Sequence, residues 1–328
     1  MCSYIKVCRI PYMLYLCVMK INYKLAYICL IVSLLVFVSY SCALKNKSNS
    51  EQALRLGFMP NITHAAALVG IEKKIFQEEL GSDVKFTPVD FIVGNSIIDA
   101  FITNQLDAAY VGPGPFINAL DKGVPLKLLS DSAYAGTLLV GAKNVLDIKP
   151  GMKIAVPQYG NTQDLILRLF LRKKGLSEKV KIIAIPPQDT GTAFYSMSID
   201  AACLPEPWGS ILIERKACNL LVNERDILNN GNYPVTLLVI DKRFASHNPK
   251  LVQSLLKAHK KVTDYIVNSP DEAILTIAIA ISNLTKKEIE QNIIDASFKR
   301  CIFKSGLNKN NLDSLLEEFK IEGTRAGY

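Results

Sequence analysis

Short runs of apolar residues alternate along most of the chain with segments in which apolar residues recur every three or four positions. The short runs predict β-strands, and the recurring pattern predicts helices. In a first group, the predicted strands are 53–59, 83–91, 108–111 and 126–131, and the predicted helices are 64–76, 96–104 and 115–122. Strands that alternate with helices in this way are typical of α/β layers.

A second group of the same kind begins after a strand at 137–143. Its predicted strands are 153–157, 180–185, 200–204 and 219–223, its helices are 162–174 and 207–216, and a strand at 234–240 returns. The remaining pattern predicts helices at 249–267, 270–281, 286–296 and 311–319. We therefore expect an α/β protein with a helical C-terminal part and two lobes joined by a two-strand hinge: lobe 1 at 51–138 and 238–328, and lobe 2 at 139–237.

An internal repeat supports the idea of two lobes. Segments 100–116 and 193–208 align at an offset of 93 residues, and the run Asp-Ala-Ala at 107–109 matches the same run at 200–202. The alternative is convergent turn chemistry, because strand-to-helix turns reuse the same residue types. The repeat favours two related lobes that face each other.

The first 42 residues differ in composition from the rest. They hold no acid, four of the 38 basic residues and five of the eight cysteines. Lys20 and Lys24 precede a run from Leu25 to Leu44 without any charge, which is the pattern of an export signal. We predict that the bulk of the chain lies outside the cytoplasm.

Cys42 follows a small residue and precedes a polar stretch, which resembles a bacterial lipoprotein signal. We therefore predict a signal peptide over 1–42, a lipid on Cys42 that anchors the protein to the membrane, and Met19, which Lys20 follows, as the true start. An uncleaved membrane anchor is the alternative, because the uncharged run is long enough to cross a bilayer.

Half of the net charge of +8 comes from the first 42 residues. The rest of the chain holds 34 basic and 30 acidic residues and three cysteines, which make no disulfide framework. The sequence contains no GxxxxGKS, HExxH, CxxC or GxSxG motif. We expect no metal site, no cofactor and no nucleic-acid partner.

Polar residues and glycines follow several predicted strands, where open α/β sheets bind their ligands. Free backbone N–H groups at a helix start also suit an anion, although ordinary N-capping is the alternative for each turn. The candidates are Asn61, Thr63 and His64; Gly94, Asn95 and Ser96; Gly112, Pro113 and Gly114; and Asn161, Thr162 and Gln163. Glu206 and Trp208, the only tryptophan, follow another strand and suggest an aromatic wall with one hydrogen-bonding group.

Four segments carry a resemblance to a known family. They are LGFMPNITHAAALVG, GNSIIDAFITNQLDAAYVGPGPFINAL, PQYGNTQDLILRLFLRKKGL and IDAACLPEPWGSIL. In order and spacing they resemble the nitrate/sulfonate/taurine family of ABC transporter substrate-binding proteins, over about residues 53–300. The resemblance implies a type II periplasmic-binding-protein fold and a binding protein, not an enzyme. It also implies delivery of a small ligand to a membrane permease that a separate ATPase drives.

The resemblance also implies which turns face the ligand. They fall on Asn61, Thr63 and His64, on Gly94 to Ser96, on Gly112 to Gly114, on Asn161 to Asp164, and on Glu206 to Trp208, and none contains Lys or Arg. An oxyanion would then be held by N–H groups, hydroxyls and helix dipoles. Because Asp164, Asp189 and Glu206 are acids near the expected cleft, we expect an anionic or zwitterionic ligand, an aliphatic sulfonate or taurine.

Other ligands and one other class of protein stay open at this point. Nitrate and bicarbonate fit the same turns, and a thiamine pyrimidine precursor would stack on Trp208 and Tyr134. The fold is also similar to that of pyrimidine-precursor synthases and of menaquinone-pathway lyases. Those enzymes are expected in the cytosol, so the export signal argues against them.

Overall fold

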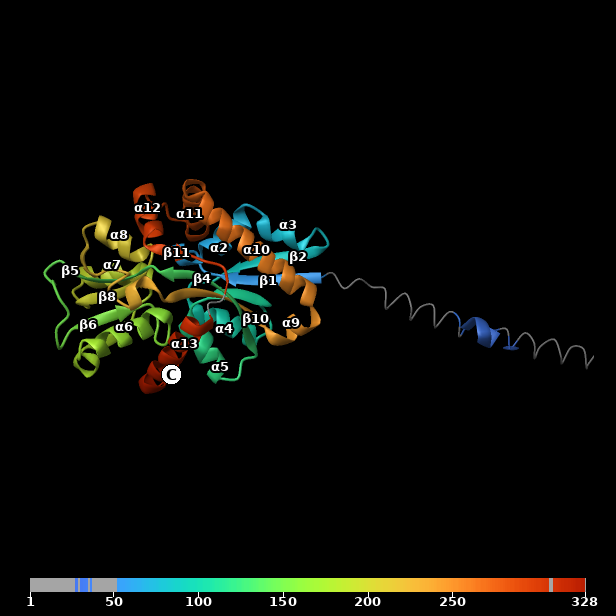
Figure 1. The fold of residues 1–328 in the computed structure, drawn as a ribbon, viewed down its shortest axis with the longest axis horizontal. Helices are drawn as coiled ribbons and strands as arrows, with labels where there is room; N and C mark the ends of the chain where they lie inside the picture. The colour runs from blue at the N-terminus through green and yellow to red at the C-terminus, as the bar shows by residue number, and fades with distance from the viewer. Residues whose placement is uncertain (1–26, 29, 35, 37–51, 307–308, 328) are drawn as a thin grey trace, which may run out of the picture. The chain divides into compact units, whose positions relative to one another are not determined.

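The computed structural model describes residues 27–28, 30–34, 36, 52–306 and 309–327 (Figure 1). The chain divides into two units, Met1–Gln52 and Ala53–Tyr328. Described residues between 27 and 36 are helical, and none of the helices in the described ranges has the length and apolar character needed to cross a membrane. Cys42, Met19 and most of the predicted signal peptide lie outside the described residues.

One mixed sheet has six strands in the order β11-β4-β10-β3-β1-β2. β1 runs parallel to β3, with Leu56 opposite Ala108, whereas β10 is antiparallel to both β3 and β4. The strands are β1 (Gln52–Phe58), β2 (Val84–Asp90), β3 (Ala108–Val111), β4 (Leu126–Ala135), β10 (Pro234–Asp241) and β11 (Cys301–Phe303). This sheet and the helices packed on it are called lobe 1 below.

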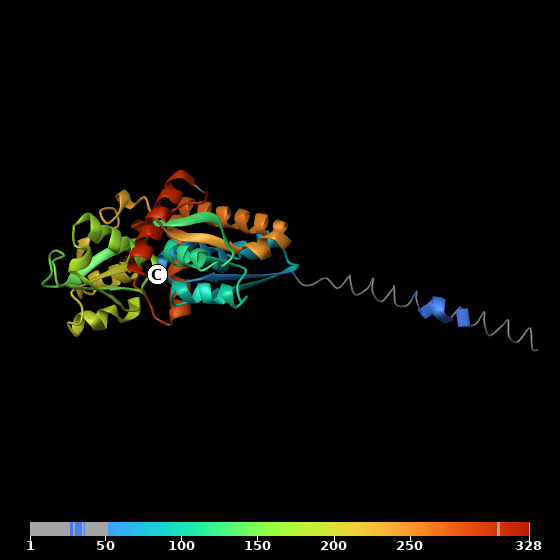
Figure 2. The same cartoon turned by 90° about the horizontal axis from the view of Figure 1, so that it is seen from below.

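A second mixed sheet has five strands in the order β7-β6-β8-β5-β9. β6 runs parallel to β7 and β8, and β5 is antiparallel to β8 and β9. The strands are β5 (Thr137–Ala142), β6 (Lys153–Val156), β7 (Lys181–Ala184), β8 (Ala201–Pro205) and β9 (Cys218–Val222). This sheet and its helices are called lobe 2, and Figures 1 and 2 show the two lobes side by side.

The two sheets share one topology. The order β4-β10-β3-β1-β2 in lobe 1 corresponds to β9-β5-β8-β6-β7 in lobe 2. Asp107 and Asp200, which the sequence repeat aligns, have the same role in the two sheets. Each carboxylate accepts a backbone N–H of the parallel neighbour strand, from Arg55 at 2.8 Å and from Lys153 at 2.7 Å. The sequence repeat therefore corresponds to a structural repeat.

Helices cover the sheets on both sides. Lobe 1 has the 3-10 helix η1 (Ile62–His64), then α2 (Ala65–Glu72), α3 (Ile75–Leu80), α4 (Gly94–Ile102) and α5 (Pro113–Asp121). Lobe 2 has α6 (Thr162–Lys173), η2 (Ser177–Lys179), η3 (Pro187–Asp189), α7 (Thr190–Tyr195) and α8 (Trp208–Glu214), with η4 (Asn229–Gly231) on the return to lobe 1. The C-terminal part holds α9 (Lys242–His247), α10 (Pro249–Asn268), α11 (Pro270–Thr285), α12 (Gln291–Lys299) and α13 (Lys309–Ala326).

The longest of these helices, α10, shows why the helical tail packs on lobe 1. Its buried residues recur at three and four positions, which places one apolar stripe along the helix. In Figure 1, α10 lies with α2, α3 and α11 on one side of the first sheet, and α4 and α5 lie on the other. The buried stripe of α10 is Leu251, Leu255, Ala258, Val262 and Ile266.

The chain changes sheet at two places, between β4 and β5 and between β9 and β10. The first change is at Gly136, whose φ is +64°, and a Cβ there would lie 2.5 Å from the Sγ of Cys301. Glycine is therefore required at this position by both conformation and space. The sequence placed the two changes after residues 138 and 237.

The C-terminal helix α13 contacts both lobes. It packs on α5 of lobe 1 and on α6 of lobe 2. A Glu322 carboxylate oxygen lies 3.1 Å from a guanidinium nitrogen of Arg172 in α6, and Lys320 lies 3.3 Å from Asp121 at the end of α5. Side chains of α13 thus connect the two lobes.

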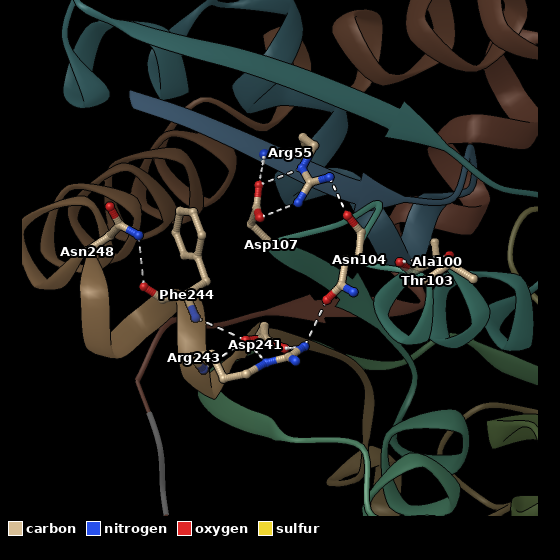
Figure 3. Close-up of polar contacts among 9 residues, drawn as sticks. All are labelled: Arg55, Ala100, Thr103, Asn104, Asp107, Asp241, Arg243, Phe244 and Asn248. Atoms are coloured by element: carbon tan, nitrogen blue, oxygen red, sulfur yellow. Dashed lines mark hydrogen bonds and ion pairs between the residues drawn. The ribbon is translucent and has the colours of Figure 1, made fainter. Parts of the chain in front are cut away.

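A polar network ties together the amino end of β3 and its neighbours, as Figure 3 shows. The Arg55 guanidinium donates two hydrogen bonds to Asp107, at 2.6 and 2.9 Å, and a third to the carbonyl of Asn104. Arg243 pairs with Asp241 at 3.0 Å and donates to the Asn104 side chain at 2.9 Å. This network lies at the opposite end of β3 from the turn that begins with Gly112.

Candidate functional site

A cavity of about 340 Å³ lies where strand ends of both lobes face each other. Lobe 1 contributes residues that follow β1, β2 and β3, and lobe 2 contributes residues that follow β6, β7 and β8. The end of α11 and the residues just after it complete the wall. The cavity therefore depends on the shared topology, because both sheets direct the ends of their parallel strands toward it.

Many of the predicted strand-end residues come together in this cavity. They belong to turns that are far apart in sequence, which shows that the predicted turns converge. The predicted residues that line the cavity are Asn61, Thr63, His64, Gly94, Gly112, Asn161, Thr162, Gln163 and Trp208.

His64 is a buried neutral donor at the cavity wall. Its Nδ1 lies 3.2 Å from the backbone N–H of Met59 and accepts that hydrogen bond, so the proton of the neutral ring is on Nε2. Burial lowers the pKa of His64 to about 3, which keeps the ring uncharged at neutral pH. Nε2 has no hydrogen-bond partner in the described chain. A buried donor without a partner is rare, and here it belongs to a residue that lines the cavity.

Asn61 and Thr63 stand beside it in the turn after β1. The Thr63 hydroxyl donates to the side-chain oxygen of Asn61 at 2.8 Å, and both side chains are buried. This bond uses the acceptor end of the amide and directs its NH₂ group elsewhere as a donor. The turn after β1 therefore presents donors, which suits an oxyanion.

The wall from lobe 2 is the start of α6. The Asn161 side chain accepts the backbone N–H of Asp164 at 2.9 Å and so caps this helix. The Asn161 NH₂ group donates to Gln163 at 3.2 Å, and Gln163 donates to Thr137 at 3.4 Å. These bonds fix the side chains at the positive end of the helix dipole, on the cavity wall.

Five polar residues of the wall were not predicted from the sequence: Asp90, Gln158, Gln188, Thr285 and Lys287. The Gln158 side-chain oxygen is buried without a hydrogen-bond partner in the described chain. Gln158 follows β6 by two positions, so the strand-end rule could have found it. Lys287 follows α11, far from any strand end, and Asp90 at the end of β2 is the carboxylate of the lining.

Gly112 and Gly114 serve the contact between lobes. A Cβ on Gly112 would lie 2.2 Å from the hydroxyl of Thr162, and a Cβ on Gly114 would lie 2.7–2.8 Å from backbone atoms of 160–162. The Gly114 N–H donates to Thr162 at 3.3 Å, and Asn118 donates to the carbonyl of Gly160 at 2.9 Å. Both glycines thus allow the turn after β3 to approach the start of α6 closely, and Gly112 also lines the cavity.

Other predicted residues lie outside the cavity lining: Asn95, Ser96, Pro113, Gly114, Tyr134, Asp164, Asp189 and Glu206. Asp164 is fully buried, accepts the N–H of Gly160 at 2.8 Å and pairs with Arg168 at 2.8 Å. The Tyr134 hydroxyl donates to Asp131 at 2.8 Å and lines a separate hollow beside β11.

Glu206 connects the two lobes beneath the cavity. Its carboxylate accepts hydrogen bonds from the Ser210 hydroxyl at 2.7 Å and from Ser297 of α12 at 3.2 Å, and lies at an ion-pair distance of 3.3 Å from Arg300. Burial raises the pKa of Glu206, and the serines and Arg300 oppose that rise. The structure therefore gives this acid a structural role between lobes.

Comparison with known proteins identifies a relative over most of the chain. A protein of Bacillus subtilis (strain 168) named for binding aliphatic sulfonates is 25% identical over 265 residues, which is 78% of each chain.

Solved structures show the same fold. The alkanesulfonate-binding protein SsuA from Xanthomonas axonopodis pv. citri, solved with MOPS, has a TM-score of 0.70 at 18% identity, over 81% of this chain and 90% of that one. The nitrate-binding protein NrtA from Synechocystis PCC 6803 has a TM-score of 0.68 at 16% identity, over 85% and 82%. The sequence pattern described as the NMT1-like family matches residues 47–282. The chain therefore belongs to the NMT1-like family and has the periplasmic-binding-protein fold that the resemblance implied.

Proposed function

We propose that this protein is the substrate-binding component of an ABC importer and that it holds an aliphatic sulfonate or taurine between its lobes. The observation that carries the proposal is the buried Nε2–H of His64, a donor without a partner at the cavity wall. The names of the Bacillus and Xanthomonas relatives support the choice of ligand.

The chemistry of the wall favours an oxyanion held by neutral donors. His64, the Asn61 amide and the start of α6 supply N–H groups from both lobes. A sulfonate accepts several hydrogen bonds on its three oxygens, and neutral N–H groups at a helix start suit such an anion. Lys287 adds one positive charge at an exposed position of the lining.

The mechanism follows from donors on two lobes. A ligand that touches both lobes at once favours the form in which they are close together, and a permease can recognise that form. The proposal includes an extracytoplasmic location, an ABC permease with its ATPase as partners, and a lipid on Cys42. The protein then acts by binding and release without catalysis.

Calorimetric titration with taurine, ethanesulfonate, nitrate and bicarbonate tests the ligand. We expect binding of ethanesulfonate or taurine in preference to the inorganic anions. Replacing His64→Ala removes a hydrogen bond to a charged group and is expected to weaken binding by about 10- to 100-fold. Ser96→Ala is the matched control, since Ser96 lies outside the lining. A preference for nitrate, or an unchanged affinity in His64→Ala, would contradict the proposal.

A further inference from the structure

A second cavity of about 280 Å³ adjoins the first one on the far side of Trp208. The two cavities share six lining residues, so they lie next to each other, and residues of both lobes border each of them. The shared residues are Pro60, Pro187, Gln188, Trp208, Thr285 and Lys287. We call the second cavity the side pocket.

The side pocket has both polar and apolar lining residues, and those of its lining residues that are buried are apolar. Ile211 and Leu212 of α8 and Ile281 of α11 are 8%, 7% and 2% exposed, and Ile289 completes the apolar wall. Trp208 is half-buried and lines both cavities, so one face of an aromatic ring can border each space. A ligand that removes apolar surface of this kind from water binds more favourably.

The charged residues of the side pocket lie at exposed positions. Arg215 and Lys287 are exposed, as is Glu288, the carboxylate of this lining. Because two of these side chains are positively charged and one is negatively charged, the side pocket disfavours a positively charged end of a ligand. Of the three acids that suggested an amino end, Asp164 and Glu206 pair with Arg168 and Arg300. These two acids and Asp189 all lie outside the lining of the main cavity.

We propose that the side pocket binds the uncharged, apolar tail of an organosulfonate whose head occupies the main cavity. This inference rests on the proposed function and names the ligand class more closely: sulfonates with an alkyl tail of several carbons, in preference to taurine. The tail passes Trp208 and covers Ile211, Leu212 and Ile281.

A chain-length series tests the proposal on the full protein. Trp208 is the only tryptophan, so its fluorescence reports on the junction between the cavities. With sodium ethane-, butane-, hexane- and octanesulfonate, affinity should rise about threefold per methylene until the side pocket is full. Affinity that does not depend on chain length would overturn the tail subsite. Failure to bind any of the four would overturn the proposed function as well.

Two variants that narrow the side pocket test whether the alkyl tail binds there. Gly191→Leu adds a side chain whose Cβ would have Leu212 as its close neighbour, at 3.3 Å, and Thr192→Phe changes an exposed residue of the same lining. Both variants should weaken the binding of octanesulfonate by at least about tenfold and leave the affinity for ethanesulfonate unchanged. Thr192→Ser should leave the affinity for both ligands unchanged. Ethanesulfonate binding also verifies folding. Equal loss for both ligands in Thr192→Phe, or no loss for octanesulfonate in either variant, would refute the proposal.

Discussion

Two buried histidines in this protein differ in how their ring nitrogens are satisfied. In His259 of α10, Nδ1 lies 2.9 Å from the Tyr110 hydroxyl and Nε2 lies 2.8 Å from the carbonyl of Asp131. In His64, Nδ1 accepts a backbone N–H while Nε2 has no partner in the described chain. A buried polar atom normally has a hydrogen-bond partner. The fold supplies both partners of His259, whereas Nε2 of His64 is free to donate to the ligand that we propose.

Neutral His64 predicts how sulfonate binding depends on pH. Because the pKa of His64 is lowered to about 3 by burial, the ring donates one hydrogen bond and carries no charge at pH 7. The affinity for ethanesulfonate should therefore stay constant from pH 7 to pH 9 in calorimetric titrations. A charged histidine as the anion partner would instead lose affinity by about tenfold per pH unit above its pKa, and such a fall would contradict this account.

The same two histidines predict a loss of stability in acid. Their pKa values in the folded state, about 3 and about 4, are below the ordinary value of 6.5. Between these values the unfolded chain binds the protons and the folded chain does not, so stability is complete above pH 6.5 and falls as the pH decreases toward 4.

Urea denaturation at pH 7 and pH 5.5 measures the contribution of one ring. In His259→Gln, the decrease in the free energy of unfolding between these pH values should be smaller than in the unchanged protein by about 1 kcal/mol. His247→Gln serves as the control, because His247 is exposed. An equal decrease in all three proteins would be evidence against the buried neutral state of His259.

Residues could be predicted where local sequence determines their place. Asn61, Thr63 and His64 directly follow a strand, and the carboxyl end of a strand is where such a sheet binds ligands. Lys287 could not be found in this way, because its position depends on how α11 packs. Nor could the partners of Glu206, since Ser297 and Arg300 come from a helix and loop about ninety residues later.

At the scale of elements, Asp107 and Asp200 occupy equivalent positions in the two sheets. We expect both to stabilise the fold and neither to take part in ligand binding. Asp107 connects β3 to β1 through Arg55, and Asp200 connects β8 to β6 through Lys153. Removing Asp107 also leaves the Arg55 side chain, which is 37% exposed, without its ion-pair partner.

We therefore expect Asp107→Ala to decrease the free energy of unfolding by about 2 kcal/mol, and Asp200→Ala by about 1 kcal/mol, in urea denaturation. Affinity for ethanesulfonate should be unchanged in both, because these residues lie at the strand ends away from the cavity. A large loss of affinity without loss of stability would show that the repeat has another role.

The predicted elements that differ from the structure do so for local reasons. The helix predicted over 64–76 covers the end of η1, all of α2 and the start of α3. α2 and α3 are separate helices because Lys74 between them takes a left-handed conformation with φ of +58°. β11 was not predicted, since a strand of three residues has too short a pattern and depends on pairing with β4. The aligned segments, in contrast, indicated two related lobes, and the two sheets share one strand order.

At the scale of the whole molecule, two glycines determine how closely the lobes approach. Gly114→Ala would place a methyl group 2.7–2.8 Å from the backbone of 160–162, and backbone atoms there cannot easily move aside. We expect weaker binding of ethanesulfonate, by about tenfold or more, together with a larger radius of gyration of the liganded protein in small-angle X-ray scattering.

Gly323→Ala is the matched control for Gly114→Ala. A Cβ at this position in α13 would have its closest contacts at 3.7 and 3.9 Å, which is ordinary van der Waals contact. Affinity and radius of gyration should equal those of the unchanged protein. If Gly114→Ala behaved in the same way, the close approach at the turn after β3 would have no part in binding.

The position of β10 between β3 and β4 has a consequence for the order in which the chain assembles during synthesis. β3 and β4 do not pair with each other, so the sheet of lobe 1 stays in two pieces until residues 234–241 emerge from the ribosome. All five strands of lobe 2 are available once residue 222 has been made. Lobe 2 begins later in the sequence, but it is therefore the first lobe that can fold, and lobe 1 is completed afterwards.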